Sequence, residues 1–274
     1  MGHPALTAGR AAVITGGASG IGLAVAQRLS GLGMKVCIAD RDEEQLAQAL
    51  ATLDNSVSGE CVDVSQMADV ERLRDRVYER FGDIAFLMNN AGTGGGGGAW
   101  QRYDGWQRVL GVNLWGVIHG LQCFVEPMLE QNSPAAIVNT GSKQGITNPP
   151  GDAAYNLSKA GVRSLTESLS HELRNTEGCQ ISAHLLVPGF TYTGLIKRHI
   201  PEKPDAAWLP EQVADELLER MAADDFYILC PDNDVTVAMD HSRLQWNTDD
   251  VANNRPALSR WHAEYADELS LIHI

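Results

Sequence analysis

The sequence has little positive charge, few cysteines and no long apolar run, and each of these shortages excludes a class of protein. Its 274 residues carry 21 Lys and Arg against 35 Asp and Glu, which gives a formal net charge of −14. Such an acidic chain is a poor partner for nucleic acid, an anionic membrane surface or an acidic carrier protein, although a local basic patch could override the average. The hydrophobic share of 44% and the charged share of 20% are ordinary for a soluble globular protein.

Cysteine is used without a recognisable pattern. The five cysteines show neither CxxC nor metal-ligand spacing, so we expect reduced, mostly buried thiols and no metal site. They are Cys37, Cys61, Cys123, Cys179 and Cys230. The first residues lack the basic and apolar regions of a signal peptide, and no apolar run approaches ~18 residues. We therefore expect a cytoplasmic protein, with residues 1–274 forming one domain with additions.

A glycine-rich turn follows an apolar stretch near the start of the chain. Residues 11–14 are small or β-branched and uncharged, as in a strand buried on both faces of a parallel sheet, and helical spacing begins at Ile21. Between them, Gly16 and Gly20 allow a tight turn, and Gly22 allows the helix to pack on the strand. The free N–H groups of the first helical turn would suit a diphosphate. Glycines at such turns also occur for packing alone.

Strands and helices alternate after this turn. We expect strands at 35–40, 60–64 and 84–88, and a helix at 67–81 whose apolar positions recur on one face. Four alternations predict an α/β fold, a doubly wound Rossmann-type parallel sheet with helices on both faces. Its ligands should bind at the carboxyl ends of the strands.

Acidic residues lie at two of these strand ends. Asp40 ends the second strand about 20 residues after the glycine turn, where a carboxylate would bind the adenosine ribose and repel a 2′-phosphate. In the alternative interpretation, Asp40 or Asp42 only caps the following helix. Arg41 could stack on adenine or accept a phosphate, so NAD is favoured and NADP stays possible. Asp63, at the end of the third strand, could contact adenine or cap the next segment.

Further motifs complete a family signature. Thr15-Gly16-xxx-Gly20-Ile21-Gly22 and Asn89-Asn90-Ala91-Gly92 are followed in order by Asn113, Ser142, Tyr155-xxx-Lys159 and the Pro188-Gly189 turn with Thr191. Through these motifs, which span about residues 8–230, the chain resembles the short-chain dehydrogenase/reductase family. The resemblance implies an oxidoreductase with a sheet of about seven strands, a nicotinamide cofactor, and the catalytic residues Asn113, Ser142, Tyr155 and Lys159.

The resemblance and the strand ends together give the expected binding residues. The cofactor would contact Gly16, Ser19, Gly20, Ile21, Gly22, Asp40, Arg41, Asp63, Val64, Asn90, Ala91, Gly92, Tyr155, Lys159, Pro188, Gly189 and Thr191. The substrate would contact Ser142, Gln144, Tyr155, Thr93, Phe190 and Tyr192.

The catalytic set suits the reduction of a ketone, which forms an alkoxide and needs a proton donor near neutral pH. Free tyrosine titrates near 10, but Lys159 lies one helical turn from Tyr155 and can lower its pKa. Ser142 can donate a hydrogen bond to the developing oxyanion. In the family, Asn113 holds a water that links the lysine to solvent. Without that context, a tyrosine and a lysine at this spacing would simply be packing residues.

Several segments depart from the family pattern. Lys143 places a charge beside the pocket and is expected to be a solvated or structural charge rather than a catalytic group. Residues 93–98, a threonine and five glycines, predict a flexible loop near the substrate. About residues 190–212 resemble the family's substrate lid, rich in aromatic and aliphatic residues, and residues 231–274 form a C-terminal extension. The apolar end, residues 269–274, has no evident structural reason.

We expect a bulky apolar, cyclic or aromatic ketone or secondary alcohol as substrate. Two long helices at about 104–130 and 153–177 should pair across a two-fold axis in a homodimer or homotetramer, unless they are buried within one chain. Two other functions stay open at this stage. One is a dinucleotide-binding regulator without turnover, and the other is a redox-neutral epimerase or dehydratase on the same fold.

Overall fold

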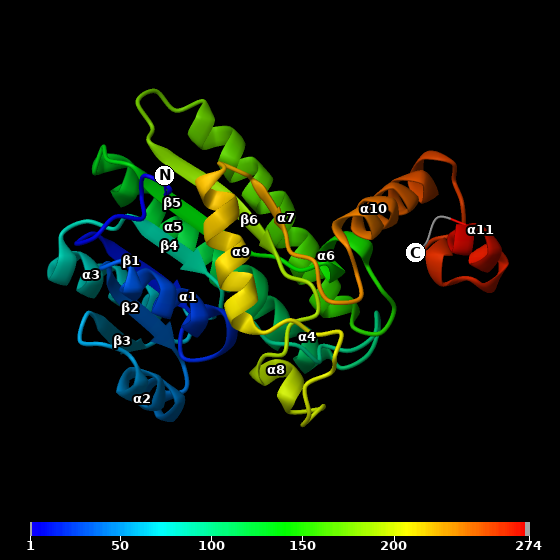
Figure 1. Ribbon diagram of the computed structural model, residues 1–274, viewed down its shortest axis with the longest axis horizontal. Coiled ribbons are helices and arrows are strands. Elements are labelled where there is room, and N and C mark those ends of the chain that lie inside the picture. The colour runs from blue at the N-terminus through cyan, green and yellow to red at the C-terminus, as the bar shows by residue number, and fades with distance from the viewer. Residues whose placement is uncertain (1, 272–274) are drawn as a thin grey trace.

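Seven parallel strands form the sheet around which the chain is wound, in the order β3-β2-β1-β4-β5-β6-β7 (Figure 1). The computed structural model describes residues 2–271. The strands are β1 Ala11–Thr15, β2 Lys35–Asp40, β3 Val57–Cys61, β4 Phe86–Asn89, β5 Ala135–Thr140, β6 Ile181–Val187 and β7 Tyr227–Leu229. The direction of winding reverses between β1 and β4, so a ligand crevice opens at their carboxyl ends. The predicted doubly wound sheet is confirmed.

Helices cover both faces of the sheet. One face carries α1 (Gly20–Gly31), α2 (Glu43–Thr52) and α9 (Pro210–Ala222), and the other carries α3 (Met67–Phe81), α5 (Gly116–Glu130) and α7 (Ala153–Arg174). The strand β1 shows why its sequence is apolar throughout. Ile14 packs into the first core and Val13 into the second, and both are fully buried. A central strand therefore has no polar face, as the sequence predicted.

The long helix before β5 contains a change of helical type that the sequence did not reveal. The predicted single helix at 104–130 is observed as α4 (Tyr103–Leu110), a π-helical turn η1 (Gly111–Trp115) and α5. Asn113 lies in that turn, and such π turns often mark functional sites. By length and composition Tyr103–Glu130 could cross a membrane, but half of its apolar window is buried inside the fold, as in the core helix of a soluble protein.

The third strand lies earlier than predicted. Residues 60–64 were expected, but β3 spans Val57–Cys61, and Cys61 pairs with Asp40 at its end. Because β3 is the edge strand and only half-buried, its residues include Ser58 and Gly59 in place of an apolar run. The prediction was wrong because the apolar pattern it relied on begins where the strand ends.

The C-terminal extension folds beside the main body. Its elements are α10 (Val237–Ala252), the 3₁₀ turns η2 (Ser259–Trp261) and η3 (Ala263–Tyr265), and α11 (Ala266–Leu271). Figure 1 shows α10 leaving the body next to α6 (Gln144–Thr147), with α11 beyond it. Trp246 of α10 donates a hydrogen bond to Ser259, which closes a small core of its own. Leu269 is buried there, while residues 272–274 lie outside the described residues.

Candidate active site

In the glycine turn after β1, two backbone positions leave no room for a side chain. Gly16 has a φ of 63°, and a Cβ on it would lie 2.7 Å from the Cα of Ala91 in the loop after β4. A Cβ on Gly22 would collide with the Gly16 carbonyl oxygen. The chain can therefore turn directly from β1 into α1, whose first-turn N–H groups face the crevice. This cradle fits the diphosphate of a dinucleotide.

Asn90 connects the three strand ends at the centre of the crevice. Its Nδ2 donates to the carbonyl oxygens of Thr15 at 3.1 Å and Gly16 at 3.2 Å, and its Oδ1 accepts from the Thr140 hydroxyl at 3.2 Å. The ends of β1, β4 and β5 are therefore held together by one amide. The neighbouring Asn89 bonds only within the buried sheet, to Asn139 at 2.9 Å.

The acidic residues at the strand ends have separate tasks. Asp42 caps α2 by accepting a hydrogen bond from the Gln45 amide at 3.0 Å. Asp40 instead accepts from the Ala18 amide of the glycine turn at 3.2 Å. Its carboxylate therefore lies beside the cradle, where an adenosine ribose would bind. Asp63 accepts from the backbone and the hydroxyl of Ser65, which supports its interpretation as a local cap.

Ser142, Tyr155 and Lys159 converge at the end of β5. Ser142 lies two residues after that strand, and its hydroxyl acts to lower the pKa of Tyr155 on α7. The ammonium of Lys159, one helical turn further, is buried and donates to the Thr140 carbonyl oxygen at 2.7 Å. A Cβ placed on Gly92 would lie 3.9 Å from that ammonium, so the loop after β4 closes the same site. A serine, a phenol and an ammonium thus face one space beside the dinucleotide cradle.

The ionisation of this group differs from the expectation. Burial lowers the pKa of Lys159 to about 8. Burial also raises the pKa of Tyr155, the charge of Asp152 raises it further, and the hydrogen bond with Ser142 acts in the opposite direction. The expected lowering of the Tyr155 pKa by Lys159 is not seen in the protein alone. The ammonium lies 5.9 Å from the ring centroid and is directed at Thr140.

Asn113 uses its side chain to hold the loop after β4. Its Oδ1 accepts from the Thr93 amide at 2.7 Å, and its Nδ2 donates to the Thr93 carbonyl oxygen at 2.9 Å and to Ser158 at 3.1 Å. The π turn therefore presents this amide to the backbone of Thr93. The water-holding role of Asn113 stays a prediction.

The glycine-rich loop is held in place by Asp152, a residue that the sequence analysis missed. The Asp152 carboxylate accepts from the amides of Gly95 at 2.8 Å, Gly96 at 3.2 Å and Gly97 at 3.2 Å. It also caps α7 by accepting from the Tyr155 amide at 3.2 Å. The amides of the glycine-rich loop thus converge on one carboxylate, and the flexibility of the loop stays a prediction. An Asp three residues before Tyr155, at the start of a helix, was the available signal.

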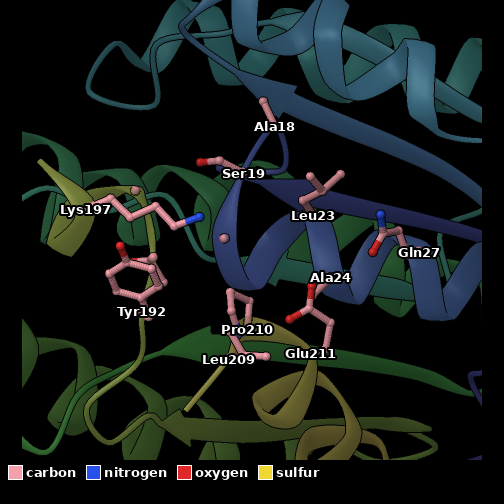
Figure 2. Close-up of a pocket in the computed structure, with 13 residues that line it drawn as sticks. Ala18, Ser19, Leu23, Ala24, Gln27, Tyr192, Lys197, Leu209, Pro210 and Glu211 are labelled. Atoms are coloured by element: carbon pink, nitrogen blue, oxygen red, sulfur yellow. The ribbon is translucent and has the colours of Figure 1, made fainter. Parts of the chain in front are cut away.

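The lid segment lies over the glycine turn. A cavity of about 340 Å³ separates them, and Figure 2 shows Tyr192 and Lys197 on one side of it and Ser19 on the other. The Tyr192 hydroxyl donates to the Pro201 carbonyl oxygen, and the Lys197 ammonium lies 5.1 Å from the Tyr192 ring centroid. Tyr192 therefore lies on the cofactor side of the lid, and its hydroxyl is occupied by the lid itself.

Four other residues expected to contact the cofactor or the substrate lie in the lid, in the serine turn and beside Asp40. Thr191 forms a β-bridge with Trp208, and the Phe190 amide donates to Asp232 at 3.2 Å. The Gln144 amide donates to the Ser142 oxygen at 3.2 Å, which fixes the turn that carries the serine. Arg41 is exposed at the rim, beside Asp40.

Comparisons with known proteins agree with this geometry. The family model for short chain dehydrogenases matches residues 10–204. The chain is 36% identical over 198 residues to 3beta-hydroxysteroid dehydrogenase 2 of Eggerthella lenta, covering 70% of this chain and 75% of that protein. It is 30% identical over 273 residues to 1-deoxy-11-beta-hydroxypentalenate dehydrogenase of Streptomyces exfoliatus, covering 96% and 98%.

A solved structure adds the cofactor. A short chain dehydrogenase/reductase from Burkholderia phymatum, in complex with NAD, superimposes with a TM-score of 0.80 at 37% identity, covering 90% of this chain and 96% of that one. The family match and these relatives identify an oxidoreductase that uses a nicotinamide cofactor, so the alternative of a binding protein without turnover is set aside. The chain belongs to the short-chain dehydrogenase/reductase family.

Proposed function

We propose that this protein transfers hydride between NAD(H) and a bulky, apolar ketone or secondary alcohol. The observation that carries this proposal is the convergence of Ser142, Tyr155 and Lys159 beside the glycine cradle. When bound, the nicotinamide ring supplies or accepts the hydride, and its positive oxidised form favours the Tyr155 phenolate.

The side chains then divide the work of proton transfer. Ser142 donates a hydrogen bond to the substrate oxygen, where negative charge develops during reduction. Tyr155 gives its phenolic proton to that oxygen, and in the oxidation direction it takes the proton back. Lys159 would hold the nicotinamide ribose, and its ammonium would stabilise the phenolate once it turns from the Thr140 carbonyl oxygen. Asn113 holds the water that returns the proton from solvent.

The preference for NAD over NADP rests on Asp40. Its carboxylate accepts hydrogen bonds from the Ala18 amide of the glycine turn and from the Asp42 amide, while Asp42 caps α2. A 2′-phosphate would meet this negative charge, whereas a ribose hydroxyl can donate to it. Arg41, exposed next to it, makes NADP the second choice.

The substrate class is supported by the lid and by one relative. The lid segment contains the aromatic residues Phe190, Tyr192 and Trp208, and the relative from Eggerthella lenta is named for hydroxysteroids, which are bulky and cyclic. The absorbance of reduced nicotinamide, followed with NADH and NADPH against bulky cyclic, aromatic and aliphatic ketones, tests both cofactor and substrate.

Tyr155→Phe should abolish turnover and leave cofactor binding intact, whereas an unchanged kcat would refute the role of Tyr155 as acid and base. Product formation without net cofactor turnover would instead favour an epimerase or dehydratase.

The active form is expected to be a homodimer or homotetramer in the cytoplasm. Trp115 at the end of η1 is 52% exposed and Leu157 on α7 is 51% exposed, so two apolar side chains of the long helices are left uncovered by the single chain. A second copy of the chain would cover them across a two-fold axis. Light scattering on the eluting protein measures this, and a monomer that turns over substrate would contradict it.

A further inference from the structure

A cluster of buried charges lies directly beneath the turn that carries Ser142. The ammonium of Lys143 is 2.6 Å from the Oδ2 of Asp240 and 3.6 Å from the Oδ2 of Asp232. The side chains of these three residues are 13%, 4% and 6% exposed, respectively. Arg243 adds a cation 3.9 Å from the other oxygen of Asp240. Buried charges tolerate little displacement, because each one depends on its partner for the solvation it has lost.

The members of this cluster come from three separate parts of the chain. Lys143 belongs to the turn after β5, Asp232 to the loop after β7, and Asp240 to the first turn of α10 in the C-terminal extension. The ion pairs therefore join two parts of the C-terminal extension to the turn that follows β5.

The cluster also contacts the Pro188-Gly189 turn, which is among the expected cofactor contacts. The Lys143 amide donates to the Pro188 carbonyl oxygen at 3.3 Å, and Asp232 accepts from the Phe190 amide at 3.2 Å. Between them, a Cβ on Gly189 would lie 2.9 Å from Asp232 Oδ2 and 3.0 Å from Lys143 Nζ. The Pro188-Gly189 turn therefore lies against Lys143 and Asp232, and only the missing side chain of glycine allows that.

A further contact fixes α10 against the serine turn. Asn247, two helical turns after Asp240, donates from Nδ2 to the Ile146 carbonyl oxygen of α6 at 3.1 Å. Apolar side chains of Ile146 and Leu244 flank the ion pair between the two helices. The helix α10 consequently contacts the serine turn through a charge, a hydrogen bond and apolar packing.

We propose that Lys143 and Asp240 are positioning residues for hydride transfer: through their ion pair, α10 holds the Ser142 turn and the Pro188-Gly189 turn at a fixed separation. The inference rests on the proposed role of Ser142. Reacting groups must be placed within a fraction of an ångström, and a misplacement of about 1 Å can cost about 100-fold in rate. The C-terminal extension is thereby part of the catalytic framework, although it contributes no group to the chemistry.

Asp240→Asn is the primary test, because it keeps the shape of the side chain and removes its charge. We expect kcat to fall by about tenfold or more, and the Kd for NADH to rise by a smaller factor because the Pro188-Gly189 turn is also an expected cofactor contact. The matched control is Asp249→Asn on the same helix, whose carboxylate accepts only a local bond from Gln245. The control should keep the kcat of the unmodified enzyme.

The pH profile separates positioning from a general effect of charge. Tyr155 faces Lys159 and Asp152 on its own helix, and Ser142 from the end of β5. Because the Ser142 hydroxyl acts to lower the pKa of Tyr155, displacing the serine should raise the half-maximal pH of alcohol oxidation. In contrast, a direct electrostatic effect of losing the negative charge at Asp240 would favour the phenolate and lower the half-maximal pH. An upward shift in Asp240→Asn therefore supports displacement, and a downward shift or none overturns the proposal.

Two further variants distinguish a loss of positioning from a general loss of stability. The triple variant Lys143→Met, Asp232→Asn and Asp240→Leu removes the buried lysine together with both carboxylates that it pairs with, and such replacements often restore stability. We expect this triple variant to regain the unfolding midpoint but not kcat, and full recovery of both would overturn the proposal. Ser142→Ala tests the underlying function: if it is inactive while Asp240→Asn behaves normally, only the positioning inference fails. If Ser142→Ala stays active, the proposed role of the serine fails first.

Discussion

Replacing Asp152 with alanine should destabilise the loop after β4 and the start of α7 at the same time. The carboxylate accepts one hydrogen bond from the Tyr155 amide and three from Gly95, Gly96 and Gly97. Loss of a helix N-cap costs about 1 kcal/mol. Of the three glycines, Gly96 is buried, and an unsatisfied buried amide costs about 1–3 kcal/mol, whereas the other two amides can bind water. The free energy of unfolding should fall by about 2–4 kcal/mol.

Denaturant unfolding of the free enzyme measures this loss, and Asp42→Ala provides the matched control. Asp42 caps α2 with a single backbone bond, so its replacement should cost only about 1 kcal/mol. Because Tyr155 lies in the first turn of α7, Asp152→Ala should also reduce kcat by about tenfold, while Asp42→Ala should not. Equal losses of stability in the two variants would refute the claim that the glycine amides depend on Asp152.

Three other predictions concern the same site. Gly96→Ala should lower the unfolding midpoint and kcat because its Cβ would collide with Ala154, whereas Gly98→Ala, with its nearest atom at 3.7 Å, should behave normally in thermal melts. Asp40→Ala should weaken the preference for NADH over NADPH by about tenfold, measured as the ratio of kcat/KM values, because a like charge facing the 2′-phosphate is removed. Between about pH 8 and 10 the unfolded chain keeps the Lys159 proton that the folded enzyme releases, so Lys159 makes stability rise with pH. Lys159→Met should therefore flatten that rise in denaturant titrations, and an unchanged slope would contradict the pKa assigned to the buried ammonium.

The apolar pattern of the sequence was sufficient for the frame of this fold. Residues 11–14 and 84–88 lack polar positions because a central parallel strand is covered on both faces, and the helix predicted at 67–81 is observed with the same bounds as α3. The edge strand β3 was misplaced because a half-buried strand does not require an apolar run. The π turn around Asn113 left no trace in the sequence, since its residues suit an ordinary helix equally well.

The site was predictable where function depends on local spacing and not where it depends on long-range contact. The glycine turn and the pair Tyr155 and Lys159 act within one turn or one helix, so their spacing in the sequence is already their geometry. The bonds from Asp152 to a loop more than 50 residues earlier, and from Lys143 to an aspartate nearly 100 residues later, required the folded chain. A charge in a sequence does not reveal its partner. Only the burial of both groups made those partners necessary, and burial is a property of the tertiary structure.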